Sequence, residues 1–312
     1  MFSSILRKMP FPRAKDLAHH DLKIRISHVG YAARRIITSE RAKLPALTVA
    51  LSATCAVLYA MGSYVTAYMH SPWGAGQFRP AVVIPAVFAS LFGPLIGGLG
   101  GAVGTLIADS ASHGQIYVRS LVSAVPGNFV GFYLFGWLMR KKFTLEKFIK
   151  TSQITLLVSN AIVAFLYVYF RVFVEASYPL AFREGWVYIS LGLVAWWYVT
   201  MLPFVLIFGP PLIRVISSAF PGLVSEEIKT SSMKTESLKR DFSLALITPG
   251  AFMLLIGMFV IFTDPNQLLA LRVAPSALIL AGMQLMFVLS GAVLLALGLL
   301  IYATGKLIGK DK

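Results

Sequence analysis

Long apolar runs alternate with short polar segments along most of the chain. Several runs exceed the roughly 18 to 20 apolar residues that a helix needs to cross a hydrocarbon core about 30 Å thick. Eight helices are predicted in this way: Leu44–Tyr68, Ala81–Phe92, Pro94–Asp109, Val118–Met139, Ile154–Val174, Trp186–Phe208, Phe242–Phe262 and Pro275–Tyr302. The pattern predicts an all-α integral membrane protein with about eight transmembrane helices.

The second and third runs are short and share a turn at Phe92, Gly93 and Pro94. Proline directly after glycine favours a tight helical hairpin over one long helix. The stretch from Phe92 to Ser110 also holds six glycines within thirteen residues, although in water each glycine costs a helix about 1 kcal/mol relative to alanine. Lipid supplies no hydrophobic force between helices, so their association depends on close backbone approach, which small residues permit. We therefore expect other helices to enclose this one.

Lys and Arg gather before Leu44, after the fourth and sixth runs, and at the C-terminus, and the net charge is +15. Because short cytoplasmic loops hold these residues, both termini are predicted to lie inside the cell. The basic tail is expected to meet anionic lipid headgroups of the plasma membrane, and nucleic-acid binding is not expected.

Four parts are predicted along the chain. They are a basic cytoplasmic N-terminal segment (1–43), a six-helix substrate-binding membrane core (44–220), a cytoplasmic linker (221–241), and a C-terminal transmembrane hairpin with a short basic tail (242–312). The linker is assigned because its stretch Ser225–Arg240 is polar and rich in hydroxyl groups.

Polar and aromatic residues cluster at the predicted outer ends of the helices. Asp109 ends the glycine-rich helix, and an acid at that depth should face a cavity or a partner. The candidate substrate contacts at these ends are Trp73, Arg79, Asp109, His113, Tyr117, Arg119, Arg171, Glu175 and Trp186. Mixed charge with aromatic rings suits a small, polar, partly flat molecule. The alternative is that the aromatic residues anchor the protein at the membrane surface and the arginines reach headgroups.

The fourth run contains SAVPGNFVG, Ser123 to Gly131. Pro126 and Gly127 are predicted to break the helix, which a membrane tolerates where the break lines protein or a water-filled cavity. Asn128 is then a candidate substrate contact, with a structural role at the break as the alternative. In the fifth run, Ser159 and Asn160 are expected to cross-link helices.

Other classes of site find no support in the sequence. The chain has one cysteine, Cys55, and no His, Cys and carboxylate set with zinc spacing, so no metal or cofactor is expected. A phosphate-binding P-loop is missing, and no nucleophile with a base is apparent. We expect neither an enzyme nor an ATPase.

Three features together resemble the substrate-binding subunits, or S components, of energy-coupling factor (ECF) transporters. They are the Ala46-xxx-Ala50 pattern, the run from Phe78 to Asp109, and the VPGN segment. The resemblance covers about Leu44 to Phe220 and leaves the tail and the last two helices outside.

The resemblance implies the substrate-binding subunit of an ECF-type ABC importer. Such a subunit captures a small water-soluble nutrient, such as a vitamin, a precursor or a similar metabolite, at the outer face. A membrane coupling subunit and cytoplasmic ATPases drive uptake, and Ala46 and Ala50 would contact the coupling subunit; internal packing of these alanines is the alternative. The alternative function is a membrane-embedded ligand sensor that signals to a separate cytoplasmic partner.

Overall fold

The computed structural model describes residues 45–68, 70, 71, 76–140, 143–177, 181–224, 228, 235–270 and 276–308. The chain divides into two compact units, residues 1–49 and 50–312. In the first unit the described residues are the start of the first helix, Pro45–Val65. The second unit holds the rest of that helix and all the other described elements.

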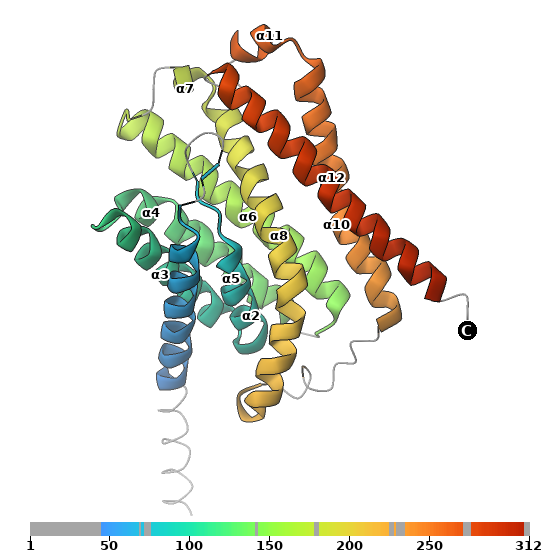
Figure 1. Cartoon of the computed structure of the whole chain (residues 1–312). Coiled ribbons are helices and arrows are strands. Elements are labelled where there is room, and N and C mark those ends of the chain that lie inside the picture. Colours follow the sequence, from blue (N-terminus) through green and yellow to red (C-terminus); the bar gives the residue numbers. More distant parts are fainter. Residues whose placement is uncertain are drawn as a thin grey trace, which may run out of the picture. The chain divides into compact units, whose positions relative to one another are not determined.

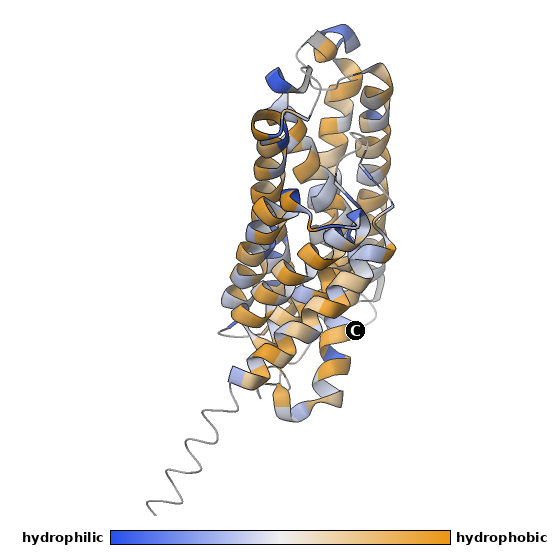
Figure 2. Cartoon of the chain, turned by 90° about the vertical axis from the view of Figure 1, so that its left-hand side faces the viewer, coloured by the Kyte–Doolittle hydropathy of each residue, from blue (hydrophilic) through white to orange (hydrophobic). Residues whose placement is uncertain are grey.

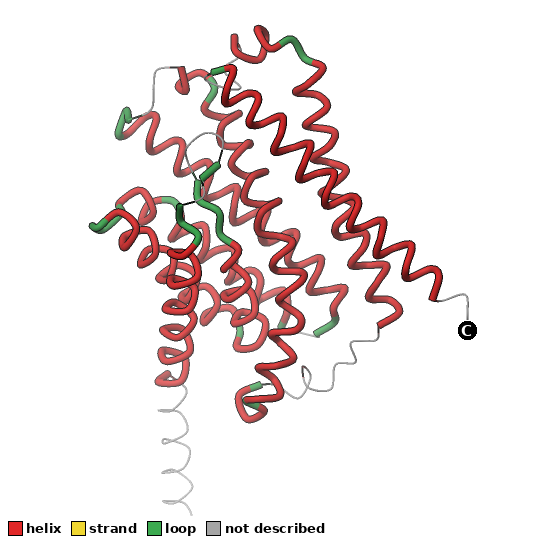
Figure 3. The backbone as a smooth tube through the Cα atoms, in the orientation of Figure 1, coloured by secondary structure: helices red, strands yellow, loops and turns green. Residues whose placement is uncertain are grey.

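The second unit is built from helices of very different lengths (Figures 1 and 3). In chain order they are η2 (Pro80–Val82), α2 (Val83–Phe92), α3 (Pro94–His113), α4 (Val118–Val122), α5 (Ala124–Met139), α6 (Leu145–Tyr169), η3 (Phe170–Val174), α7 (Ala181–Glu184), α8 (Trp186–Ala219), η4 (Pro221–Leu223), α10 (Thr235–Phe262), α11 (Pro265–Ala270) and α12 (Ala277–Ile308). No strand occurs among the described residues.

Six of the described helices are long and apolar enough to cross a membrane. They are Pro45–Val65, Pro94–His113, Leu145–Val174, Trp186–Ala219, Phe242–Phe262 and Leu280–Thr304, and two shorter apolar helices, Pro80–Phe92 and Ala124–Met139, accompany them. Apolar residues predominate along these helices in Figure 2. The prediction of an all-α, multi-pass membrane protein is confirmed, whereas the orientation of the termini and the four-part division stay predictions.

A tight turn at Gly93 separates α2 from α3, as predicted. Gly93 has φ +101°, a conformation that residues with a Cβ rarely adopt. Pro94 then begins α3, where its fixed φ suits the helix and its missing N–H costs no intrahelical bond. The two short helices therefore form a hairpin.

The glycines of α3 bring other helices close on two sides. A Cβ at Gly100 would overlap Cys55, and one at Gly104 would lie 2.7 Å from the Ala56 carbonyl oxygen; both neighbours belong to the first helix. On the other side, a Cβ at Gly101 would overlap the ring of Phe132 in α5. The expectation that other helices enclose this one is confirmed.

The break in the fourth apolar run lies at Ser123, between α4 and α5. The prediction of a break at Pro126 and Gly127 was wrong, because Pro126 falls in the first turn of α5, where a missing N–H costs no helical bond. Gly127 is a normal helical residue that donates its N–H to the Ser123 carbonyl at 3.1 Å. Because Gly127 has no side chain, α5 and α6 can pack closely at this point; a Cβ at Gly127 would overlap Val163 of α6.

The last two long helices, α10 and α12, pack along each other as an antiparallel hairpin (Figure 1). A Cβ on Gly250 would lie 2.7 Å from the Leu295 nitrogen, and the Ser243 hydroxyl donates to the Gly298 carbonyl at 2.8 Å. Helix α10 also packs against α6. Small residues and one buried hydroxyl thus hold this hairpin together.

Replacing Gly136 with alanine tests the backbone contacts that position these helices. A Cβ there would lie 2.5 Å from Pro94 Cα and 2.6 Å from its nitrogen, and backbone atoms cannot rotate away. We expect Gly136→Ala to lower the free energy of unfolding by about 1 to 3 kcal/mol, measured as a lower thermal midpoint in detergent. Gly222→Ala is the matched control, because a Cβ at Gly222 meets nothing within 4 Å. Equal midpoints for both variants would contradict this packing.

Candidate functional site

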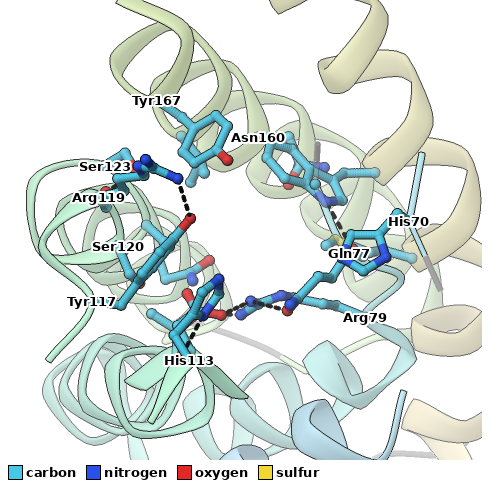
Figure 4. A pocket seen from close by; sticks show the side chains of 18 of the residues that line it. His70, Gln77, Arg79, His113, Tyr117, Arg119, Ser120, Ser123, Asn160 and Tyr167 are labelled. Atoms are coloured by element: carbon cyan, nitrogen blue, oxygen red, sulfur yellow. Dashed lines mark hydrogen bonds and ion pairs between the residues drawn. The ribbon is translucent and has the colours of Figure 1, made fainter. Parts of the chain in front are cut away.

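A cavity of about 200 Å³ lies among the first helix, α3, α4, α5, α6 and α8 (Figure 4). Four lining residues come from the segment between the first helix and η2: His70, Gly76, Gln77 and Arg79. Its lining combines arginine, carboxylate, carboxamide, hydroxyl and imidazole groups with the rings of tyrosine and tryptophan. The cavity can therefore bind a polar molecule that also has a flat face.

Seven of the ten predicted substrate contacts line this cavity: Arg79, Asp109, His113, Tyr117, Arg119, Asn128 and Arg171. Five of them lie on α3, α4, α5 and η3, and Arg79 and Tyr117 directly precede η2 and α4. That these side chains bind a substrate stays a prediction.

The other three predicted contacts lie elsewhere. Glu175 does not line the cavity but binds Arg119. Trp186 packs among aromatic rings, with centroids 5.9 Å from Phe165 and 5.8 Å from Phe173. Trp73 lies outside the described residues.

A buried ion pair joins Arg79 to Asp109 at one wall of the cavity. Their exposed fractions are only 8% and 5%. The guanidinium also donates from Nη1 to Thr105 Oγ1 at 2.5 Å and from Nη2 to Gln77 Oε1 at 2.9 Å. Burial lowers the pKa of Arg79, but the Asp109 carboxylate and the Tyr59 side chain together more than offset this, so the pKa lies above its ordinary value. Arg79 therefore remains a cation and ties its loop to α3.

The main-chain carbonyls of the loop segment before Arg79 accept hydrogen bonds from α8 and from the turn after the first helix. Trp197 of α8 donates from Nε1 to the Gln77 carbonyl at 3.0 Å, and Thr66 donates to the Phe78 carbonyl at 2.9 Å. Gly76 has φ +75° and packs under Trp197, where a Cβ would come within 2.9 Å of the ring. These contacts fix the Gln77 carboxamide at the cavity.

Three buried polar residues of the lining, which we call the floor, are Ser120, Asn128 and Asn160. Asn160 Nδ2 and Ser120 Oγ are buried and have no hydrogen-bond partner in the described protein. Leaving a buried polar group unpaired costs about 1 to 3 kcal/mol, so such groups need an explanation. Asn128 differs, because its Oδ1 lies 3.4 Å from the Ser159 hydroxyl. The floor thus offers unused hydrogen-bonding groups to a bound molecule.

The more exposed rim, which we call the mouth, carries His113, Tyr117, Arg119 and Arg171. The His113 ring stacks on Tyr117 with centroids 3.7 Å apart. His113 Nδ1 lies 2.7 Å from the Asp109 carbonyl, and because a carbonyl only accepts, Nδ1 carries the proton. Arg119 donates from Nε to Glu175 Oε2 at 2.7 Å across 56 positions of sequence.

The lining residues that were not predicted as substrate contacts include Asn160, Tyr167 and Trp197. Asn160 was expected to cross-link helices. Its carboxamide side chain within an apolar run is the sequence feature that could have identified it as a cavity residue. Tyr167 and Trp197 gave no such signal, because aromatic residues are common throughout the membrane helices.

Comparison with known proteins gives one family match. The model of the ECF-type riboflavin transporter S component family matches residues 46–218, more than half of the chain. The matched region contains every lining residue of the cavity and ends before α10. Neither the curated proteins nor the solved structures include a significant match.

Breaking the Arg79–Asp109 pair tests its structural role. Asp109→Ala leaves a buried guanidinium without its carboxylate, and we expect a loss of about 3 to 5 kcal/mol in unfolding free energy. Replacing both partners, as Arg79→Met with Asp109→Leu, should recover most of this loss. Thermal unfolding in detergent measures the loss of stability in the single variant and its recovery in the double variant.

The matched control for this pair is Glu146→Ala, which breaks an exposed ion pair with Lys150. It should cost no more than about 1 kcal/mol. If Asp109→Ala is no more damaging than this control, the buried pair does not hold the loop to α3.

Proposed function

Because the chain belongs to the ECF-type riboflavin transporter S component family, we propose that its cavity binds riboflavin or a close flavin relative for uptake. Membership makes it the substrate-binding subunit of an ECF transporter and a multi-pass protein of the plasma membrane, and the predicted resemblance to S components is confirmed. The family is a transport family and not an enzyme family. The identity of the substrate and the use of ATP by partner subunits are parts of the proposal.

The unpaired polar atoms of the floor carry the proposal. A flavin has a flat fused ring system whose one edge alternates carbonyl, N–H and ring-nitrogen groups. Carboxamides such as Asn128 and Asn160 can both donate and accept, so they match such an edge. Tyr117, Tyr167 and Trp197 supply ring faces at the same cavity.

The size of the cavity supports a particular placement of the flavin. Its volume of about 200 Å³ is just below the roughly 300 to 1,000 Å³ of sites that enclose a whole drug-sized ligand. It can therefore enclose part of a flavin, and the buried floor suits the ring edge better than the flexible sugar-alcohol tail. The tail then lies toward the mouth.

Family membership implies ECF membrane and ATPase subunits as partners. We propose that the coupling subunit contacts the first helix at Ala46 and Ala50. Both side chains are exposed and stand four residues apart, so they share one face of that helix. Small residues let a second helix approach closely without exposing a polar group to lipid.

Substitution of the floor carboxamides tests flavin binding. Asn160→Ala and Asn128→Ala each remove one hydrogen-bonding partner, and we expect each to weaken riboflavin binding about tenfold. Quenching of flavin fluorescence by the detergent-purified protein gives the dissociation constants. The control Asn266→Ala, at an exposed position in α11, should bind riboflavin as the wild type does.

Two results would contradict the proposal. In the first, the folded wild-type protein does not bind riboflavin. In the second, it binds riboflavin with the same affinity after either floor substitution, which would place the flavin elsewhere.

A bulky residue on the first helix tests the partner surface. Ala50→Trp should leave riboflavin binding unchanged, because Ala50 is exposed and does not line the cavity, but should abolish copurification of the coupling and ATPase subunits. The control is Leu157→Trp, which adds the same ring at an exposed position of α6. Loss of the subunits with Leu157→Trp but not with Ala50→Trp would move the partner surface to α6.

A further inference from the structure

We infer that Glu175 is a positioning residue, which the distorted end of α6 presents to Arg119 so that it holds α4 in place as one side of the cavity. Glu175 does not itself line the cavity, and it acts through Arg119, which does. This role is independent of which molecule the cavity binds; only its effect on ligand release rests on the proposed function.

Helix α4 is short and buries little surface of its own. Of its five residues only Ser120 is buried, and the side chains of Val118 and Leu121 are 51% and 47% exposed. A segment with few buried apolar contacts opens locally at a low cost in free energy. Figure 4 nevertheless shows Tyr117, Arg119 and Ser120 along one side of the cavity. A tie to a neighbouring element therefore decides how firmly this side is held.

Both ends of α4 are interruptions of the helical backbone. Gly114 follows α3 as its C-cap with φ +67°, and a Cβ there would meet nothing within 4 Å. Ser123, between α4 and α5, has φ −121° and ψ −63°, which are not helical values. Neither α3 nor α5 therefore continues into α4 as one rigid helix.

One ion pair joins α4 to the end of α6. Arg119 donates from Nε to Glu175 Oε2 at 2.7 Å, and the two side chains are 29% and 24% exposed. A charge-assisted bond that is partly shielded from water is stronger than a pair on the open surface. Ser177 donates its hydroxyl to the same Glu175 oxygen at 3.1 Å. The carboxylate is thus held by its own segment while it holds α4.

The backbone that carries Glu175 departs from an ordinary helix. Residues Phe170–Val174 form a π-helical turn, in which the Glu175 N–H donates to the Phe170 carbonyl at 2.9 Å. Such a turn contains one residue more than an α-helical turn, is rare, and is frequent at functional sites. The extra residue rotates Glu175 by about 100° around the helix axis, compared with an uninterrupted α-helix.

The residue after Glu175 is also unusual. Ala176 has φ +50°, a left-handed conformation that is unfavourable for a residue with a Cβ and persists where the surrounding structure enforces it. This turn brings the Ser177 N–H to the Arg171 carbonyl at 3.0 Å and the Ser177 hydroxyl to Glu175. The π-turn and the turn at Ala176 together place the carboxylate that Arg119 binds.

Hydrogen exchange in the ligand-free full chain, purified in detergent, tests this role. The reporters are the N–H groups of Leu121 and Ser123, whose helical hydrogen bonds close α4. We expect Glu175→Gln to speed their exchange about three- to tenfold, because the neutral amide binds Arg119 less strongly. Exchange in α3 and α5 should stay as in the wild type. Mass spectrometry of peptides from these helices measures the rates.

The matched control is Glu146→Gln, which makes the same chemical change in the ion pair between Glu146 and Lys150 of α6. It should leave exchange in α4 unchanged, because neither residue contributes to the cavity lining.

A deletion of one residue tests the π-turn separately. Val174 is 61% exposed, so its removal costs little packing while it converts the turn to an α-helical one. The deletion should turn Glu175 away from Arg119 and speed α4 exchange as much as Glu175→Gln does.

Riboflavin release is the functional readout. Because α4 carries Arg119 and Ser120 of the lining, Glu175→Gln should raise the dissociation rate of riboflavin about three- to tenfold. Stopped-flow flavin fluorescence measures this rate, and Glu146→Gln should show the wild-type value.

The outcomes separate this role from the proposed function. Unchanged exchange in α4 after Glu175→Gln, or exchange that rises equally in α3, α4 and α5, overturns the role of Glu175. Faster α4 exchange with an unchanged riboflavin dissociation rate also overturns it, because Glu175 would then support α4 without affecting the cavity. If the folded protein binds no riboflavin, the proposed function fails, and the exchange rates alone decide whether Glu175 holds α4.

Discussion

Close contact between helix backbones is the constraint on which the rest of this structure depends. In lipid no hydrophobic force drives helices together, so they associate where small residues let their backbones meet. Gly100 and Gly104 of α3 meet the first helix, Gly101 meets α5, and Gly127 of α5 meets α6. These contacts fix the order of four neighbouring helices.

The same contacts determine where the polar groups lie. Because α3, α5 and α6 pack closely, Asp109, Asn128 and Asn160 reach one cavity although they are far apart in the sequence. Charge at this depth is costly unless it is paired, and the Arg79–Asp109 pair meets that requirement inside the wall. The unsatisfied groups at the floor then stand out as groups available to a ligand.

The helices and the hairpin turn could be predicted because apolar length and a Gly-Pro pair act locally. Helix ends were harder, since polar residues can extend a helix beyond the membrane. Helix α6 begins at Leu145, nine residues before the predicted Ile154, because Thr144 caps it by accepting the Lys147 N–H at 3.2 Å. The break predicted within Ser123–Gly131 is present, but it lies at Ser123 and not at Pro126, because a proline fits in the first turn of a helix.

The candidate site was predictable only in part. Residues at outer helix ends were identifiable because polar and charged groups there are unusual, and six of them line the cavity. Which residues contact one another was not identifiable. Glu175 stands four residues after Arg171, which suggests a local pair, but its 2.7 Å contact is to Arg119, 56 positions away. Such a pairing depends on how α4 packs against α6 and η3, and one sequence does not encode this in a local pattern.

The most direct test of the central claim is an experimental structure of the full chain with a flavin bound. The account predicts the ring edge at the floor, with Asn160 Nδ2 and Ser120 Oγ within about 3.5 Å of flavin nitrogen or oxygen atoms, and the tail directed to Arg119 and Arg171. A flavin bound outside this cavity, or one whose ring leaves both floor atoms unpaired, would contradict it.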